Sequence, residues 1–213
     1  TTYTTNGKPD GLEEDKEVCS SLLSNIYANI LPERQNAMEV HPEYFSNRVK
    51  NIVVKEETEL YLTFVDEGAG YKNVLGYYTY KEGETPTSED QLDKIVIFPN
   101  ASAEGSGGEL IKGNTMRLLG TFEPGTVVGF FLIANGWVNG FITDGYYSQY
   151  TNFDFNLSGR QQSIIFYDKT CNSTVIAFED ISVPNGDNDF NDAIFEISAS
   201  NPSAIDTSEF NQI

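Results

Sequence analysis

The chain has 213 residues, and its 32 Asp and Glu against 13 Lys and Arg give a formal net charge of -19 at pH 7. So strong a negative charge repels nucleic acid and anionic membrane surfaces, so we expect no nucleic-acid partner, and no apolar run approaches the ~20 residues of a membrane-spanning helix. With 12 Tyr, 14 Phe and 18 Gly, the composition favours a mainly β protein with many turns.

The N-terminal quarter of the chain is expected to differ from the rest. Residues 1–10 are polar and rich in Thr, which predicts a disordered lead-in. Residues 11–56 form a helical and irregular segment, with a helix predicted over 12–31 until Pro32 ends the helical period. The apolar stripe of this helix consists of Val18, Leu22, Ile26 and Ile30. We expect the stripe to pack on the remainder of the domain or on a partner.

From residue 57 onward the apolar period changes from 3.6 to 2, which indicates strands. Eight strands are predicted, over residues 59–65, 74–80, 94–98, 116–122, 126–134, 163–168, 174–180 and 193–198. Short strands separated by polar Gly and Pro turns are typical of an antiparallel β-sandwich, here of jelly-roll type, over 57–200. The Pro124–Gly125 turn is predicted to join two of these strands as a hairpin, and residues 201–213 are a C-terminal tail.

The two cysteines, Cys19 and Cys171, are too few for a disulfide framework and are not spaced as zinc ligands. The sequence leaves two readings open for them. They form a disulfide in an oxidising compartment, or they remain two separate thiols.

The stretch FEDISVPNGDNDFNDAIFEIS, residues 178–198, gathers six carboxylates around a tight turn without a basic residue. Like charges at ~4 Å and an effective dielectric near 20 repel by ~4 kcal/mol a pair, so a missing cation would explain the cluster. Dense oxygen ligands favour calcium over magnesium, because calcium accepts six to eight oxygens in flexible geometry. Phe190, an apolar residue among the candidate ligands, is expected to pack the loop down.

The acidic stretch has two alternative interpretations. The spacing of Asp187, Asp189 and Asn191 matches the start of an EF-hand loop, but Asp192 stands where that loop needs Gly and a strand follows in place of a helix. The remaining ligands would therefore come from Glu179 and Asp180 at the end of the preceding strand. The other reading is an acidic surface turn with solvated charges.

Three segments of the chain resemble a known family: GFFLIANGW (129–137), IIFYD (164–168) and IAFEDISVPNGDNDFNDAIFEI (176–197). They resemble domain-of-unknown-function family 4114, found in LruC-type bacterial surface proteins and in large secreted adhesins. DEGAGYKNVLGYYTY (66–80) fits its opening strands, so the resemblance covers about residues 57–198. It implies an exported β-sandwich with a calcium site and no established enzymatic activity. The cation ligands that it implies are Glu179, Asp180, Asp187, Asp189, Asn191 and Asp192.

Other candidate sites are weaker. A catalytic triad would have to use His41, the only histidine, and no nucleophile signature accompanies it. Residues 136–150 are rich in aromatic side chains with Asn and Asp nearby, as in sugar-binding sites, although core packing of these rings is the alternative. The aromatic residues concerned are Trp137, Tyr146, Tyr147 and Tyr150.

These observations predict a non-enzymatic, exported surface or adhesion module with a structural calcium ion. The alternative is a carbohydrate-binding module or a glycan-acting enzyme that uses the aromatic loop 136–150. The sequence begins without Met or a charged-then-apolar leader, which indicates a chain that is either soluble as made or a trimmed mature form. The net charge of -19 and the dependence on calcium favour an extracellular setting, so we expect a mature form located outside the cell or on a bacterial surface. A surface glycan or another cell-surface protein is the expected partner.

Overall fold

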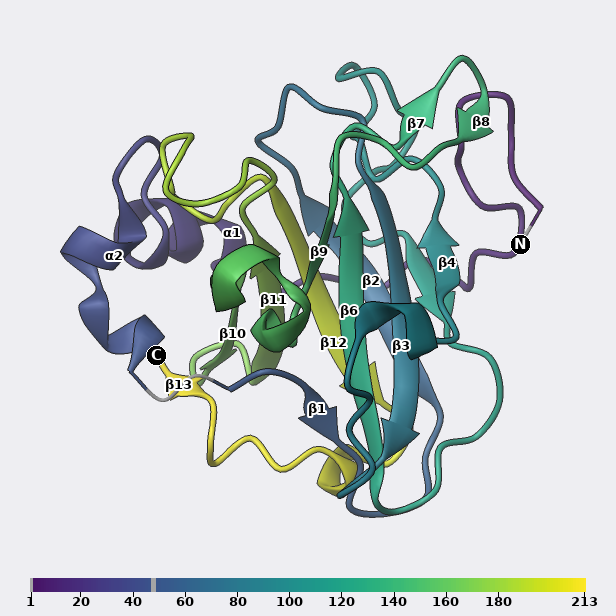
Figure 1. The fold of residues 1–213 in the computed structure, drawn as a ribbon, viewed down its shortest axis with the longest axis vertical. Helices are drawn as coiled ribbons and strands as arrows, with labels where there is room; N and C mark the ends of the chain where they lie inside the picture. Colours follow the sequence, from purple (N-terminus) through teal and green to yellow (C-terminus); the bar gives the residue numbers. More distant parts are fainter. Residues whose placement is uncertain (1, 47–48) are drawn as a thin grey trace.

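The computed structural model describes residues 2–46 and 49–213. Two sheets lie face to face in it, with the N-terminal segment packed along one side (Figure 1). The predicted mainly β fold with an antiparallel sandwich is therefore confirmed.

The first sheet has five strands, with β6 at its centre. β6 pairs along its length with β3, while β1 and β9 pair with different parts of its other edge. Its strands are β1 (Ile52–Val53), β3 (Val74–Lys81), β4 (Ile95–Phe98), β6 (Thr126–Ile133) and β9 (Ser148–Tyr150).

The second sheet has six strands in the order β13-β10-β11-β12-β2-β5, and only the β10–β13 pair is parallel. Its strands are β2 (Leu60–Asp66), β5 (Thr115–Arg117), β10 (Ser163–Asp168), β11 (Ser173–Phe178), β12 (Ala193–Ala199) and β13 (Asn211–Gln212). The neighbours β11 and β12 form an antiparallel pair in which Phe178 lies opposite Ala193. This register fixes which residues meet at the end of the sheet.

Short elements complete the fold. β7 (Trp137–Val138) and β8 (Phe141–Ile142) form a separate hairpin. Single helical turns lie at α2 (Ala37–Val40), η2 (Pro42–Phe45), η3 (Glu89–Gln91), η4 (Phe153–Phe155), η5 (Leu157–Gly159) and η6 (Pro202–Ala204). None of the helices in the described part of the chain combines the length and the apolar character needed to cross a membrane.

The core between the sheets is built from alternate residues of both sheets. Phe64, Ile176 and Phe195 of the six-stranded sheet are buried there together with Tyr77 and Phe130 of the five-stranded sheet. Successive side chains of a strand point to opposite faces, so every second residue faces this core, as the period of 2 in the sequence predicts. Seven of the eight predicted strands agree with the structure within two residues at both ends.

The strand predicted over 116–122 and its hairpin are wrong. β5 ends at Arg117 and pairs with β2, whereas β6 lies in the other sheet. Phe122 forms an isolated bridge with Thr58 instead of extending β5. The turn at Pro124–Gly125 does form, with a positive φ of 78° at Gly125, but it follows a crossing between sheets.

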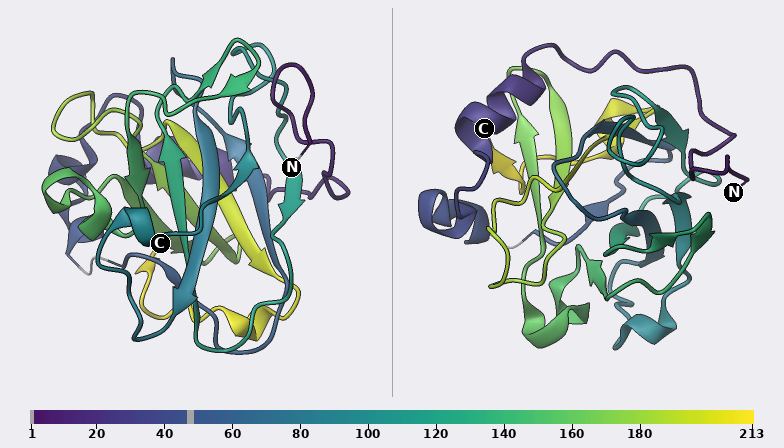
Figure 2. Two further views of the ribbon diagram at one scale, coloured as in Figure 1. Left: turned by 45° about the vertical axis from the view of Figure 1, so that its right-hand side comes forward. Right: turned by 90° about the horizontal axis from the view of Figure 1, so that it is seen from above.

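The N-terminal segment covers the outer face of the six-stranded sheet (Figure 2). The four predicted stripe residues are buried there, against Phe166 and its neighbours on β10 and β11. The helix that carries them is shorter than predicted, since α1 spans Leu22–Asn25 and continues as the π-helix η1, Ile26–Ile30.

The first half of the helix predicted over 12–31 is therefore wrong. Residues before α1 run beside the end of β5, where the backbone N–H of Glu13 donates to Thr115 O and that of Lys16 donates to Gly113 O, both at 2.9 Å. A backbone N–H bonded to a neighbouring segment cannot also bond within a helix.

Residues 2–10, where the sequence predicts a disordered lead-in, form a loop closed by a bridge between Tyr3 and Pro9. The Tyr3 ring packs edge-on against Trp137 with centroids 5.3 Å apart, and Thr4 Oγ1 donates to Glu109 at 2.7 Å. Cys19 and Cys171 form a disulfide, which selects the first of the two readings left open by the sequence.

Candidate metal centre

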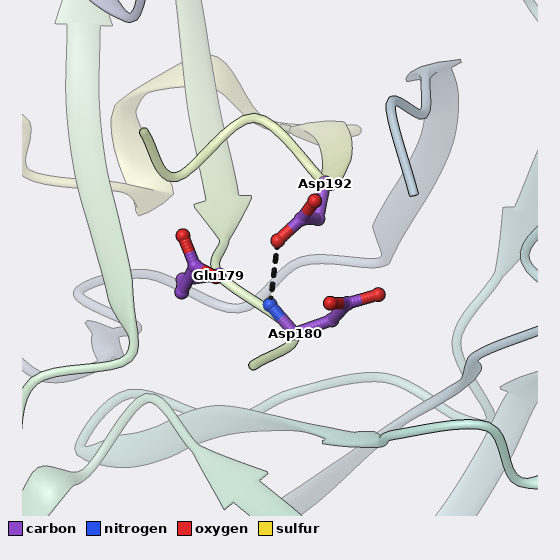
Figure 3. Close-up of side chains that lie close together, drawn as sticks. All are labelled: Glu179, Asp180 and Asp192. Atoms are coloured by element: carbon purple, nitrogen blue, oxygen red, sulfur yellow. Dashed lines mark hydrogen bonds between the residues drawn. The ribbon is translucent and has the colours of Figure 1, made fainter. Parts of the chain in front are cut away.

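The pairing of β11 with β12 brings the predicted acidic residues together. Glu179 and Asp180 directly follow β11, and Asp192 directly precedes β12, so the antiparallel register places all three at one end of the sheet. Asp192 N donates to Phe178 O at 3.1 Å, and Asp180 N donates to Asp192 Oδ2 at 2.8 Å (Figure 3). The two strand ends are thereby held against each other.

The loop between these strands brings two further carboxylates to the same place. Glu179, Asp187 and Asp189 each offer an oxygen within 4.8 Å of the other two, and so do Glu179, Asp180 and Asp192. We call these five residues the acidic cluster. Gly186 turns the loop with a φ of 78°, and a Cβ there would lie 2.9 Å from Glu179 Oε1, so glycine allows this close approach.

Phe190 anchors the loop, as expected. Its side chain is fully buried, and its ring packs edge-on against Phe45 with centroids 5.2 Å apart. Its φ of 59° lies in the left-handed region, which a bulky residue adopts only when surrounding contacts hold it there. Phe190 therefore fixes the part of the loop next to β12, whereas residues 184–187 at its tip are exposed.

The N-terminal segment contributes the other wall of the site, beside the loop in Figure 1. Arg34 N donates to Asp189 Oδ2 at 2.8 Å, and Ala37 N donates to Asn188 O at 2.8 Å. Leu31 O accepts from the Asn191 side-chain amide at 3.1 Å. Three backbone groups of this segment thus hold the loop that carries the acidic residues.

Burial raises the pKa of four carboxyl groups in the acidic cluster, and the neighbouring carboxylates raise it further. The pKa of Asp192 rises to about 9, first through burial and then through Asp180 and Glu179. The pKa of Glu179 rises to about 7 through burial and through Asp187 and Asp189. The pKa values of Asp180 and Asp189 also lie above their ordinary value, mainly because of burial. Without a cation, the folded protein therefore disfavours full ionisation of the cluster.

Neither side chains nor backbone fully compensate this negative charge. Among residues 2–46 and 49–213, no Lys, Arg or His forms an ion pair with a member of the acidic cluster. Glu179 is fully buried, and its Oε2 has no hydrogen-bond partner in the described structure. Asn188 Oδ1 in the same loop is likewise buried and unpartnered. Buried oxygens without partners are rare in folded proteins and call for an explanation.

An all-oxygen donor set of this kind fits a hard divalent cation. Carboxylate and carbonyl oxygens are the ligands of calcium and magnesium, and calcium tolerates the more irregular arrangement. The cluster opens to a surface cleft lined by residues of the N-terminal segment, the β2–β3 loop and the acidic loop, namely Glu33, Arg34, Gly68, Tyr71 and Asp187.

Two acidic-stretch residues behave differently from the rest. Asn191, predicted as a ligand, donates its side-chain amide to Leu31, and its Oδ1 lies 3.0 Å from the position of a Cβ on Gly68. Of the Asn191 side chain, only that oxygen can ligate a cation. Glu196, the sixth carboxylate of the stretch, lies within β12 and pairs with Lys16 at 2.8 Å, so it is no part of the site.

The part of the chain that matches a known family includes the acidic cluster. Residues 122–200 match the family described as Domain of unknown function (DUF4114). No curated protein and no solved structure matches the chain. The DUF4114 match runs from Phe122 and includes β6 to β12 with the whole acidic cluster. The strands β2 to β5, which the sequence resemblance included from residue 57, lie outside it.

Several residues that build the site also lie outside the DUF4114 match and were not foreseen. Asn73, just before β3, donates its amide to Asp180 Oδ2 at 2.8 Å. Arg34 and Leu31 act through backbone atoms, which leave no mark in a sequence. The position of Asn73 before a predicted strand was the one available signal.

The aromatic residues of the loop 136–150 do not share one exposed surface. Trp137 is buried under Tyr3, and Tyr150 is buried on the outer face of the five-stranded sheet. Tyr147 is half-buried, and its hydroxyl accepts from Ser182 N at 3.1 Å. Tyr146 is exposed, and its ring packs against Tyr71 with centroids 5.3 Å apart.

Proposed function

We propose that this protein is a non-enzymatic, exported surface or adhesion module that binds calcium in the acidic cluster as a structural ion. The observation that carries the proposal is Glu179, which is fully buried between two sets of carboxylates with an unpartnered oxygen. A cation would supply both the missing partner and the missing positive charge. The adhesion role rests on the resemblance of the acidic stretch to domains of bacterial surface proteins.

The extracellular setting has two supports. Disulfides such as that between Cys19 and Cys171 form and persist mainly in oxidising compartments. Calcium is also abundant outside the cell, where modules with dissociation constants of ~10⁻⁴ to 10⁻³ M are still filled.

The test is thermal unfolding of metal-free protein with and without added calcium. A ligand that binds only the folded state at ~100 times its dissociation constant adds ~2.7 kcal/mol to the free energy of unfolding, so calcium should raise the midpoint. Asp189→Asn should remove most of this increase, because it deletes a charge and leaves one of the two oxygens that accept from the Arg34 and Asn191 N–H groups. Asp144→Asn, an exposed acid outside the cluster, is the matched control and should respond like the wild type.

An unchanged midpoint in millimolar calcium would contradict the calcium proposal. A calcium response that Asp144→Asn loses and Asp189→Asn keeps would place the ion elsewhere on this acidic chain.

The alternative function, carbohydrate binding, has support in one observation. Tyr71 lines the cleft above the acidic cluster, and its partner Tyr146 has 63% of its surface exposed. Exposed aromatic faces beside a polar cleft suit a sugar ring. Binding on a glycan array that is lost in Tyr146→Ala would favour this function. Loss in Trp137→Ala alone would not, because Trp137 is buried.

A further inference from the structure

The acidic cluster contains two overlapping groups of ligands that share a single residue. One group is Glu179, Asp180 and Asp192, which we call the inner group, and the other is Glu179, Asp187 and Asp189, the outer group. We infer that the cluster holds two cations, one in each group, with the Glu179 carboxylate bridging them. This inference rests on the proposed calcium function and adds a second ion to it.

Charge balance supports two ions. The five carboxylates of the cluster carry five negative charges when ionised, and the described structure places no cationic side chain in an ion pair with them. One divalent cation leaves three of those charges uncompensated inside a largely buried site, whereas two leave one. Desolvated like charges repel strongly. A second ion therefore neutralises two of the three negative charges that remain when one ion is bound.

The orientation of Glu179 provides a separate argument. Ile181 N donates to Glu179 Oε1 at 3.3 Å, while Oε2 has no hydrogen-bond partner although the residue is fully buried. A carboxylate can use its two oxygens, or both lone pairs of one, for different cations. Glu179 belongs to both groups, and its Oε2 has no hydrogen-bond partner that would compete with a cation.

The two groups differ in how firmly the protein holds them. In the inner group, Asp180 accepts from the Asn73 amide and Asp192 accepts from Asp180 N, both at 2.8 Å. In the outer group, Asp189 accepts from Arg34 N and Asn191 N. Asp187, by contrast, is exposed to solvent, so its carboxylate must be ordered when an ion binds. Ordering a side chain costs binding free energy, so we expect the inner group to bind its cation more tightly than the outer group.

Equilibrium dialysis of metal-free protein against increasing calcium, followed by metal analysis, tests the inference. About 0.15 M salt screens the general negative charge of the chain. The wild type should bind two calcium ions per chain, in two steps. Asp187→Asn should lose the weaker step and Asp180→Asn the tighter one, since each belongs to one group. Glu179→Gln should weaken both steps, and Asp144→Asn should keep both.

The outcomes separate this inference from the proposed function. One calcium per chain in the wild type would overturn the two-ion centre and leave the calcium function standing, whereas no bound calcium would overturn both. Two ions that persist in Asp187→Asn and in Asp180→Asn would overturn the assignment to these groups. The wild-type count decides the number of ions even if Glu179→Gln does not fold.

Discussion

Glu179 and Asp192 have pKa values far above those of ordinary carboxyl groups. Their pKa values in the folded, metal-free protein are about 7 and about 9, against ~4 in an unfolded chain. Between ~4 and these higher values the folded state holds more protons than the unfolded state. The free energy of unfolding therefore falls as pH rises through this window.

The first residue-scale prediction is that metal-free protein has a higher thermal midpoint at pH 6 than at pH 8.5. Calcium should shrink or reverse this difference, because protons and cation compete for the same oxygens. Differential scanning calorimetry at the two pH values measures it, and Asp192→Asn, which cannot ionise, should show much less pH dependence. Equal or higher metal-free stability at pH 8.5 would show that the cluster ionises without cost.

Phe190 carries the second residue-scale prediction. Because its side chain is fully buried against Phe45 in a left-handed backbone conformation, Phe190→Ala should lower the free energy of unfolding by ~3–5 kcal/mol. It should also weaken calcium binding, since the ring holds the loop between Asp189 and Asp192. Urea denaturation and a calcium titration measure the two effects. A loss below ~1 kcal/mol, with unchanged calcium affinity, would contradict the anchoring role.

At the scale of elements, the strands could be predicted because their signal is local. In β2, β10 and β12 every second residue faces the core between the sheets, as alternating apolar residues predict, and the acidic ligands lie within one short stretch of the chain. The pairing of β5 with β2 in place of β6 depends on contacts across the whole sandwich, so a local turn at Pro124–Gly125 suggested the wrong hairpin.

The N-terminal segment shows why the helix boundaries and the contacts around the site could not be predicted from the sequence. Its apolar spacing correctly identified Val18, Leu22, Ile26 and Ile30 as buried, but the same spacing extended the helix too far. Its contacts with the site use the backbone of Leu31, Arg34 and Ala37. Every residue has such backbone groups, so no residue type marks the contact.

The attachment of this segment to the sheet gives an element-scale prediction. The disulfide between Cys19 and Cys171 spans 152 residues, and a cross-link over so long a loop stabilises by roughly 3–5 kcal/mol through restriction of the unfolded chain. The double variant Cys19→Ser/Cys171→Ser should lose stability of this order in denaturant titrations. Wild type treated with a reducing agent should behave like the variant, and equal midpoints for oxidised and reduced protein would contradict the prediction.

At the scale of the whole molecule, the acidic cluster lies where separate parts of the chain meet. The N-terminal segment, the residues that follow β2 and precede β3, and the ends of β11 and β12 all contact it, through Arg34, Gly68, Asn73 and Asp192. A cation there would join parts of the chain that are distant in sequence. We therefore expect calcium to stabilise the sandwich against global unfolding, and not the acidic loop alone.

The most direct test of the cation site is calorimetric titration of calcium into metal-free protein at about pH 7.5, in two buffers of different ionisation enthalpy. Asp192, with a pKa of about 9, holds a proton at that pH and must lose it to ligate a cation. We expect saturable binding with release of about one proton per chain, seen as a difference in heat between the buffers. No binding heat in either buffer at millimolar calcium would contradict it, and the buried acids would then be neutralised by protons alone.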